Sequence, residues 1–309
     1  MNHLYNVSNV LEMKGFNLSS EVVFPTFLFA TLSYLFILFC NLILILTIVL
    51  NKSLHQPIYL ILLNLPINDL MGSSALFIQL LKNLLTDGGP TLYSTCVSQA
   101  FFIHIYAAGA VFILTAMAYD RYIAICCPLQ YNAVMTHAHV IKIITVVWLT
   151  CLLLTGILFV LLLRLPRCRS VISHTYCDNP TLLTLVCANT TGNNIYGLIT
   201  VAFSQLVANG IILFTYLQIL RACFRSKRSD TKAKALQTCA THLLVYLLLE
   251  CLGLFTIISY RLKNLSPHFR KFIGVMTFVF PPAINPVIYG LKTKEIRDKI
   301  VQFFRRKIN

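Results

Sequence analysis

Seven long apolar stretches constrain the fold of this 309-residue chain. A helix needs about 20 mostly apolar residues to cross the hydrocarbon core of a bilayer, and every stretch is at least that long. Apolar residues make up 57% of the sequence and charged residues only 11%, a composition typical of membrane proteins. The sequence therefore predicts an all-α membrane protein, a seven-transmembrane helix bundle. The predicted spans are residues 22–50, 57–84, 94–126, 140–163, 194–223, 236–260 and 270–291.

The distribution of Lys and Arg predicts the orientation of the bundle. Basic residues accumulate on the cytoplasmic side of membrane proteins. Here they gather after the fifth span, from Arg221 to Lys234, and in the tail from Lys292 to Lys307. With seven spans these two segments lie on one side, which we expect to be cytoplasmic. The chain is then a plasma-membrane protein with an extracellular segment 1–21, a bundle 22–291 and a cytoplasmic tail 292–309.

The tail has its own helical pattern. Apolar residues recur at Ile296, Ile300, Phe303 and Phe304 among basic ones, a spacing that predicts a short amphipathic eighth helix on the inner membrane surface. A disordered basic tail is the alternative.

Two kinds of residue mark the segments that this orientation places outside. Asn6 and Asn17 begin glycosylation acceptor sequences, so we expect a glycoprotein. Four cysteines also lie in outside segments, where disulfides persist: Cys96, Cys168, Cys177 and Cys187. Four cysteines allow three pairings, and their positions in the sequence do not choose among them.

One charged pair lies at the cytoplasmic end of the third span. Asp120 and Arg121 end a run that is otherwise apolar, and ionised groups in hydrocarbon by default indicate a functional site. An Arg at this place can exchange one partner for another. The alternative is a helix-end Arg whose guanidinium extends to the lipid headgroups.

Several classes of protein are excluded by what the sequence lacks. It has no glycine-rich phosphate loop, no zinc-spaced Cys/His cluster and no nucleophile elbow, so it does not indicate an enzyme. The net charge of +15 is explained by a membrane surface and an intracellular partner rather than by nucleic acid. A transporter or channel would show repeat symmetry and paired charges along a path, and neither is apparent.

The motifs, taken in order, resemble those of the rhodopsin-like G-protein-coupled receptors and, within them, the olfactory receptors. The resemblance extends from Asn41 to about Arg297. The double proline and the tail resemble the fish-like class, whose ligands tend to be water-soluble. The motifs are Leu54–Tyr59 after the first span, Met117–Tyr122 with Ile125–Cys126 in the third, Thr241–Leu243 in the sixth, and Pro281–Pro282 with Asn285–Pro286 and Ile288–Tyr289 in the seventh.

The resemblance implies a function and a set of roles. The protein would be an odorant receptor that acts in sensory transduction, activates a stimulatory G protein and raises cyclic AMP, without a cofactor. The family would pair Cys96 with Cys177 and Cys168 with Cys187. Receptors for other small ligands outside the olfactory system share most of these motifs and form the alternative function. The implied activation residues are Asp120, Arg121, Tyr216, His242, Asn285 and Tyr289. For the two tyrosines, interfacial anchoring is the other interpretation.

The sequence departs from the family at several positions. Ala110 stands where many olfactory receptors carry an acid in the third span, which weakens the assignment of Asp69 as a sodium ligand. A hydrogen-bonded pair of Asp69 with Asn285 is the simpler interpretation. Glu250 stands where the family has a tyrosine in the sixth span.

Ionisable and small residues suggest a ligand pocket in the outer half of the bundle. Glu250 and Arg261 lie eleven residues apart, and therefore on one face of a helix, with Leu254 and Ile257 between them. His104 can approach the same cavity from the third span. Arg261 could instead be an interfacial charge, and His104 a core histidine. Small side chains follow His104 at helical spacing and leave room: Ala107, Ala108 and Val111.

Overall fold

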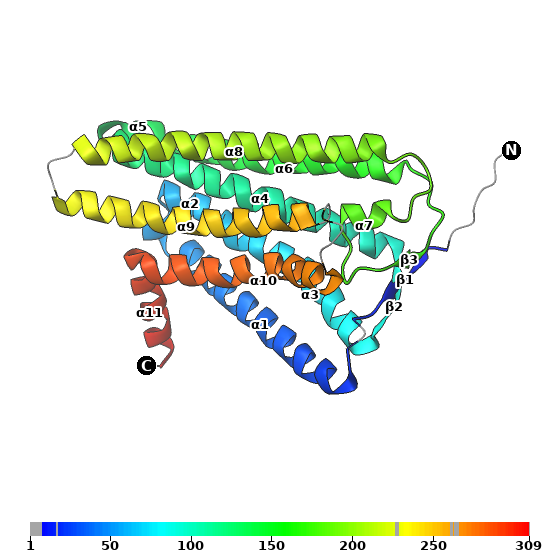
Figure 1. Cartoon of the computed structure of the whole chain (residues 1–309). Coiled ribbons are helices and arrows are strands. Elements are labelled where there is room, and N and C mark those ends of the chain that lie inside the picture. Colours follow the sequence, from blue (N-terminus) through cyan, green and yellow to red (C-terminus); the bar gives the residue numbers. More distant parts are fainter. Residues whose placement is uncertain (1–7, 17, 226–228, 260–261, 263–265, 309) are drawn as a thin grey trace.

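The computed structural model describes residues 8–16, 18–225, 229–259, 262 and 266–308. Within this part of the chain, seven helical spans are long and apolar enough to cross a membrane, so the predicted bundle is confirmed. Figure 1 shows most of them running side by side, with α1 set obliquely. The spans are α1 (Ser20–Leu50), α2 with α3 (Pro57–Leu62 and Asn64–Thr86), α4 (Tyr93–Cys126), α6 (His137–Leu163), α8 (Thr191–Arg225), α9 (Ser229–Ser259) and α10 (Pro267–Lys292).

The second span is interrupted at Leu63, where α2 ends and α3 begins. Pro66 explains the break. Its ring nitrogen carries no hydrogen, so it cannot bond to the carbonyl of Leu62 four residues earlier, and its ring clashes with that carbonyl.

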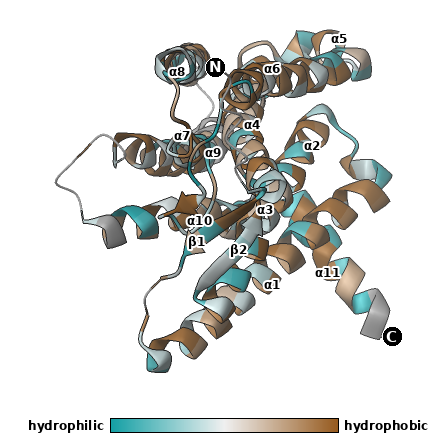
Figure 2. Cartoon of the chain, turned by 90° about the vertical axis from the view of Figure 1, so that its right-hand side faces the viewer, coloured by the Kyte–Doolittle hydropathy of each residue, from teal (hydrophilic) through white to brown (hydrophobic). Residues whose placement is uncertain are grey.

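Helix α4 lies at the centre of the bundle and contacts α3, α6, α8 and α9. Its side chains are mostly buried, whereas α1 and α6 expose many large apolar side chains. Figure 2 shows long apolar stretches along both of these helices. In a membrane these surfaces contact lipid, which explains why they are apolar without being packed against protein.

Shorter helices connect the spans, and one follows them. They are η1 (Lys52–Leu54), η2 (Pro128–Gln130), α5 (Tyr131–Val134), α7 (Asn179–Leu183) and α11 (Lys294–Ile308). The last is the predicted amphipathic helix, which turns away from the end of α10 in Figure 1. Ile296 is fully buried, while Phe304 is exposed.

A small three-stranded sheet closes one end of the bundle, and the sequence analysis did not predict it. Strand β1 (Val10–Lys14) lies between β2 (Gly88–Leu92), which is antiparallel to it, and β3 (Val171–Ile172), which is parallel. Leu11 and Met13 point inward and are buried, and the alternate residues of β1 are exposed. This two-residue alternation, short as it is, is what a half-buried strand requires.

Two disulfides lie at the same end. Cys96 of α4 is bonded to Cys177, with 5.3 Å between the Cα atoms, and Cys168 is bonded to Cys187, with 5.8 Å. Both pairings implied by the resemblance are therefore confirmed. We call this end of the bundle the disulfide end and the opposite one, where α4 finishes, the Arg121 end.

Candidate functional site

Glu250 of α9 is an acid within a membrane-spanning helix. Its side chain is only 7% exposed. Tyr246 and Gln205 lie close enough to interact with its carboxylate, but neither carboxylate oxygen forms a hydrogen bond of good geometry with the described residues. A buried polar group without a partner costs free energy, and at a functional site a ligand can supply the missing partner.

Polar side chains of α8 extend this site. The hydroxyl of Tyr246 donates to Asn209 Oδ1 at 3.1 Å, and Asn209 Nδ2 donates to Gln205 Oε1 at 2.8 Å. Gln205 and Asn209 are four residues apart, so they share one face of α8. Together with Glu250 they form a polar cluster between α8 and α9. The sequence analysis did not predict Gln205, Asn209 or Tyr246. Two amide side chains four residues apart inside an apolar span are nevertheless a detectable signal.

The predicted residues of α4 differ in exposure and in their contacts. Ala107 is exposed although α4 is the central helix, while Val111 is buried. His104 Nδ1 lies 2.8 Å from the carbonyl oxygen of Ala100 in its own helix, and its ring meets Phe159 of α6 edge-on. These contacts agree with a core histidine. No hydrogen bond or ion pair joins His104 to Glu250 in the described structure.

The remaining predicted pocket residues divide into two groups. Ala108 is half-buried beside Cys151 of α6, and on α9 Ile257 is half-buried and Leu254 is exposed. Arg261 lies outside the described residues, as do the acceptor asparagines Asn6 and Asn17.

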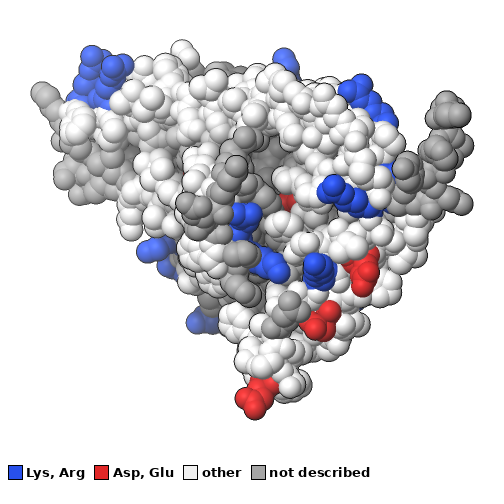
Figure 3. Space-filling model, turned by 45° about the vertical axis from the view of Figure 1, so that its right-hand side comes forward, with Lys and Arg blue, Asp and Glu red and all other residues white. Residues whose placement is uncertain are grey.

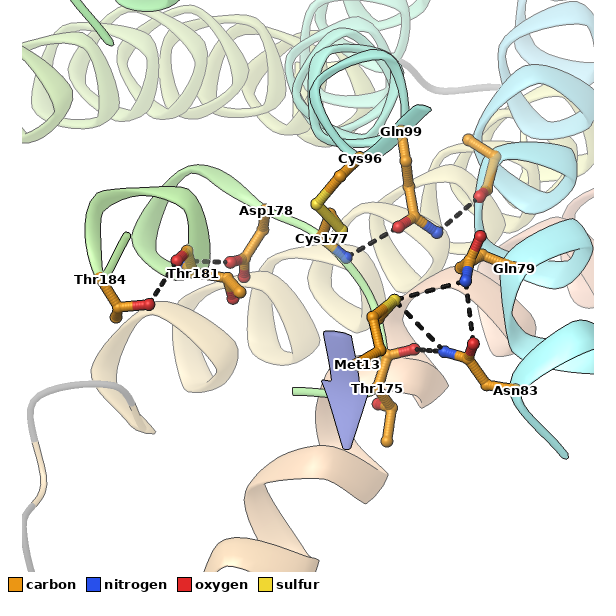
Figure 4. Close-up of a disulfide and its surroundings, with 11 residues drawn as sticks. Met13, Gln79, Asn83, Cys96, Gln99, Thr175, Cys177, Asp178, Thr181 and Thr184 are labelled. Atoms are coloured by element: carbon orange, nitrogen blue, oxygen red, sulfur yellow. Dashed lines mark hydrogen bonds between the residues drawn. A yellow bond between two sulfur atoms is a disulfide. The ribbon is translucent and has the colours of Figure 1, made fainter. Parts of the chain in front are cut away.

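The loop that carries Cys177 covers the disulfide end and is held to the helices by buried amides. Figure 4 shows Gln99 of α4 beside the Cys96–Cys177 bond. Its Oε1 accepts from the Cys177 backbone N–H at 2.7 Å, and its Nε2 donates to the Ala75 carbonyl of α3 at 2.8 Å. One side chain thus links α3, α4 and the loop.

A second amide pair connects α3 to the first strand. Gln79 Nε2 donates to Asn83 Oδ1 at 2.8 Å, and Asn83 Nδ2 donates to the Thr175 carbonyl at 3.1 Å. Both amides also lie against the sulfur of Met13, with Gln79 Nε2 at 3.3 Å (Figure 4). The sheet is therefore fixed to the bundle by polar as well as apolar contacts.

Basic residues surround the disulfide end. Figure 3 shows Lys and Arg side chains beside a hollow in the face that is turned toward this end, with an acidic side chain visible in the hollow. Arg164 and Arg169 are exposed in the segment after α6, and Arg270 and Lys271 lie near the start of α10. Exposed basic side chains beside a concave surface raise the local concentration of anionic ligands.

His174, in the loop after β3, lies within this basic surface. Burial lowers its pKa below the usual 6.5. Asp178 opposes this shift, and Lys271 and Arg270 add to it. Its protonation is therefore unfavourable in the folded protein.

At the Arg121 end, Asp120 is held by a tyrosine. Its carboxylate is 1% exposed, and Oδ1 accepts from the hydroxyl of Tyr131 in α5 at 2.8 Å. No Asp120–Arg121 ion pair closer than 4 Å occurs in the described part of the chain. Burial raises the pKa of the Tyr131 phenol, and the nearby Asp120 carboxylate raises it further. The phenol therefore keeps its proton and remains a hydrogen-bond donor. Arg121 therefore interacts with the neighbouring acid at longer range and forms no close ion pair with it in the described structure.

The implied activation residues gather around Arg121. Its guanidinium lies within electrostatic range of Tyr216, His242 and Tyr289, which come from α8, α9 and α10. Tyr216 and His242 share a hydrogen bond of 2.7 Å, and their rings are stacked. This bond joins α8 to α9. Tyr289 is buried, and its hydroxyl has no partner among the residues described.

Asp69 and Asn285 meet in the middle of the bundle. Asn285 Nδ2 donates to Asp69 Oδ2 at 2.9 Å, so the hydrogen-bonded pair expected as the simpler interpretation is present. Asp69 Oδ1 has no partner within the described structure, and Ala110 is buried without offering a second acid. Among the described residues, no group of three His, Cys, Asp or Glu side chains could hold a metal ion. Sodium binding at Asp69 stays a prediction.

Comparison with known proteins identifies the family. The family model described as olfactory receptor matches residues 30–307. Human olfactory receptor 52D1 is 35% identical over 272 residues, which cover 87% of this chain and 86% of that protein. Human olfactory receptor 8A1 is 32% identical over 317 residues, covering 98% and 93%. This chain belongs to the olfactory receptor family.

Membership of the olfactory receptors confirms several predictions. The chain is an odorant G-protein-coupled receptor, a multi-pass membrane protein that takes small-molecule ligands, and the family is not enzymatic. Human olfactory receptor 52J3 is 33% identical over 277 residues, which cover 89% of this chain. The polar cluster between α8 and α9 and the residues around Arg121 thus belong to an odorant receptor.

Proposed function

We propose that this olfactory receptor binds a small, polar, water-soluble odorant in the half of the bundle nearest the disulfide end. The N-terminus and the disulfide end face the extracellular side, so that Asn6 and Asn17 can be glycosylated. The hollow beside these basic residues is the entrance. One observation carries the proposal: Glu250 is an acid buried in a membrane span, and its carboxylate forms no hydrogen bond of good geometry with the described residues.

The chemistry of the cluster favours particular ligands. An ionised Glu250 binds an amine, and Asn209, Gln205 and Tyr246 provide further donors and acceptors next to it. Arg261 follows eleven residues further along the sequence, outside the described residues, and a guanidinium binds a carboxylate through two hydrogen bonds. An odorant with one charged group binds either Glu250 or Arg261, and a long odorant with both an amine and a carboxylate binds both residues.

Signalling follows from the other end of the bundle. We propose that the bound odorant favours a state in which α9 moves away from α8 and the Tyr216–His242 bond breaks. Arg121, which is not paired with Asp120, then contacts a stimulatory G protein, and cyclic AMP rises. Such a receptor couples two distant sites through two states of one helix arrangement.

Two substitutions test the ligand chemistry. In cells that express the receptor, Glu250→Gln is expected to abolish cyclic-AMP responses to amine odorants and to leave responses to carboxylic acids. Arg261→Ala is expected to do the reverse. Each loss should exceed about tenfold in the half-maximal concentration, because a charge-assisted hydrogen bond is removed.

Glu21→Gln is the matched control, since it makes the same chemical change at an exposed position at the start of α1. An unchanged response profile in both pocket variants would refute the pocket.

A further inference from the structure

A groove of about 490 Å³ lies at the disulfide end, between α3 and the β1–β2 pair. Its volume is within the range of roughly 300–1,000 Å³ that is common for small-molecule sites. It contains neither Glu250 nor any predicted pocket residue. Its lining residues are Val10, Ile78, Gln79, Lys82, Pro90, Thr91, Leu92 and Thr95.

Three apolar side chains on the walls of the groove are strongly exposed. Ile78 is 67% exposed, Leu92 54% and Val10 44%. Val10 and Leu92 are directly opposite each other in the antiparallel pair, so their side chains lie next to each other on the outward face of the sheet. Ile78 is within the membrane-spanning part of α3. The groove thus offers exposed apolar side chains on both of its walls at one edge of the span.

Lys82 places a cation beside this surface. It follows Ile78 by four residues and so shares its helix face, one turn before α3 ends at Thr86. Lys82 Nζ donates to the Pro90 carbonyl oxygen at 2.7 Å, which leaves two of its three N–H groups for another acceptor. No carboxylate of the described chain lies within 4 Å of it. The end of a membrane span is the depth at which phospholipid headgroups meet hydrocarbon.

We propose that this groove is a binding site for one phospholipid of the leaflet at the disulfide end. The phosphate accepts hydrogen bonds from Lys82 and from the hydroxyl of Thr95, and an acyl chain lies along Ile78, Leu92 and Val10. A free fatty acid offers the same two acceptor oxygens but has only one acyl chain, whereas a phospholipid has two for the apolar side chains on both walls of the groove. The bound lipid connects α3 to the sheet, so it stabilises the end of the bundle where the odorant enters.

The test uses the purified full-length receptor in detergent micelles and native mass spectrometry. The lipids added are dioleoyl phosphatidylglycerol, dioleoylglycerol and oleate. We expect the receptor to retain phosphatidylglycerol about tenfold more tightly than dioleoylglycerol, because only the former carries the phosphate. Retention in Lys82→Gln should fall to the dioleoylglycerol level, and Lys82→Arg should restore it.

Lys14→Gln is the matched control, since Lys14 is an exposed lysine of β1 that does not line the groove. It should bind phosphatidylglycerol as the unmodified receptor does. Equal retention by Lys82→Gln and the unmodified receptor would overturn the site. Oleate bound as tightly as phosphatidylglycerol would overturn the choice of a phospholipid. The comparison of the three lipids on the unmodified receptor decides the question even if a variant does not fold.

Discussion

The two ends of the bundle are held together in different ways. At the disulfide end, two disulfides, a sheet made from three separate segments and the amides of Gln79, Asn83 and Gln99 join the helices to the loops. At the Arg121 end, the described polar contacts are a few hydrogen bonds without a covalent link, such as Tyr131 to Asp120 and Tyr216 to His242 and to the Cys239 carbonyl.

This difference agrees with what a receptor has to do. A single hydrogen bond contributes about 1 kcal/mol net, so thermal fluctuations and ligand binding can break it. A disulfide does not open on the timescale of signalling. The disulfide end can therefore keep its shape while the Arg121 end changes between two arrangements, and a ligand at one end can alter the population of the other.

Removing the Cys96–Cys177 disulfide should have the largest effect. Cys177→Ser removes the bond to Cys96 and is expected to cost about 2–5 kcal/mol of stability, with loss of surface expression and signalling. Surface labelling and thermal unfolding in detergent measure this. Cys251→Ser, which changes a free and exposed cysteine, is the control. A fully active Cys177→Ser receptor would show that the covalent tie is dispensable.

At the other end, a substitution should affect signalling without affecting the fold. Arg121→Ala is expected to reduce the cyclic-AMP response at least tenfold, since no cation is left for the G protein. Surface amount should not change, because Arg121 has no acidic partner within 4 Å in the described structure. Arg297→Ala, an exposed arginine of α11, should signal normally. Normal signalling by Arg121→Ala would identify Arg121 as a helix-end residue only.

The smallest expected effect is a pH dependence confined to the disulfide end. The pKa of His174 is lower in the folded protein than its usual 6.5, so below about pH 6.5 the unfolded chain takes up the proton first. The contribution of His174 to the free energy of unfolding is therefore fully present above this pH, and it decreases as the pH falls toward the folded pKa. We expect a fall of roughly 1 °C in the unfolding midpoint between pH 7.5 and 5.5. His174→Gln should remove this component, and His55→Gln, at the Arg121 end, should not.

The spans and both disulfide pairs could be predicted, for different reasons. Hydrophobic length follows from the bilayer and needs no knowledge of contacts. The pairing of Cys96 with Cys177 came from the family resemblance, because spacing alone left three pairings. The break at Leu63 is a local effect of Pro66, and the sequence contained its signal.

What could not be predicted depends on contacts between distant segments. Strand β1 has five residues, too few for a distinctive pattern, and it exists because β2 and β3 supply its partners. The same holds for Asp120, whose sequence neighbour Arg121 suggested a partner that the structure replaces with Tyr131. The bond of Tyr246 to Asn209 likewise needs the packing of α9 against α8.

The sheet also has a consequence for the order of events during synthesis. Strand β1 is among the first residues to be made, but its partner β3 follows α6. The first strand can pair with β2 once the second membrane span has been synthesised, but its parallel ladder with β3 can form only after the fourth. Closure of the sheet is then a late step, which reports that the first half of the receptor has been inserted and assembled correctly.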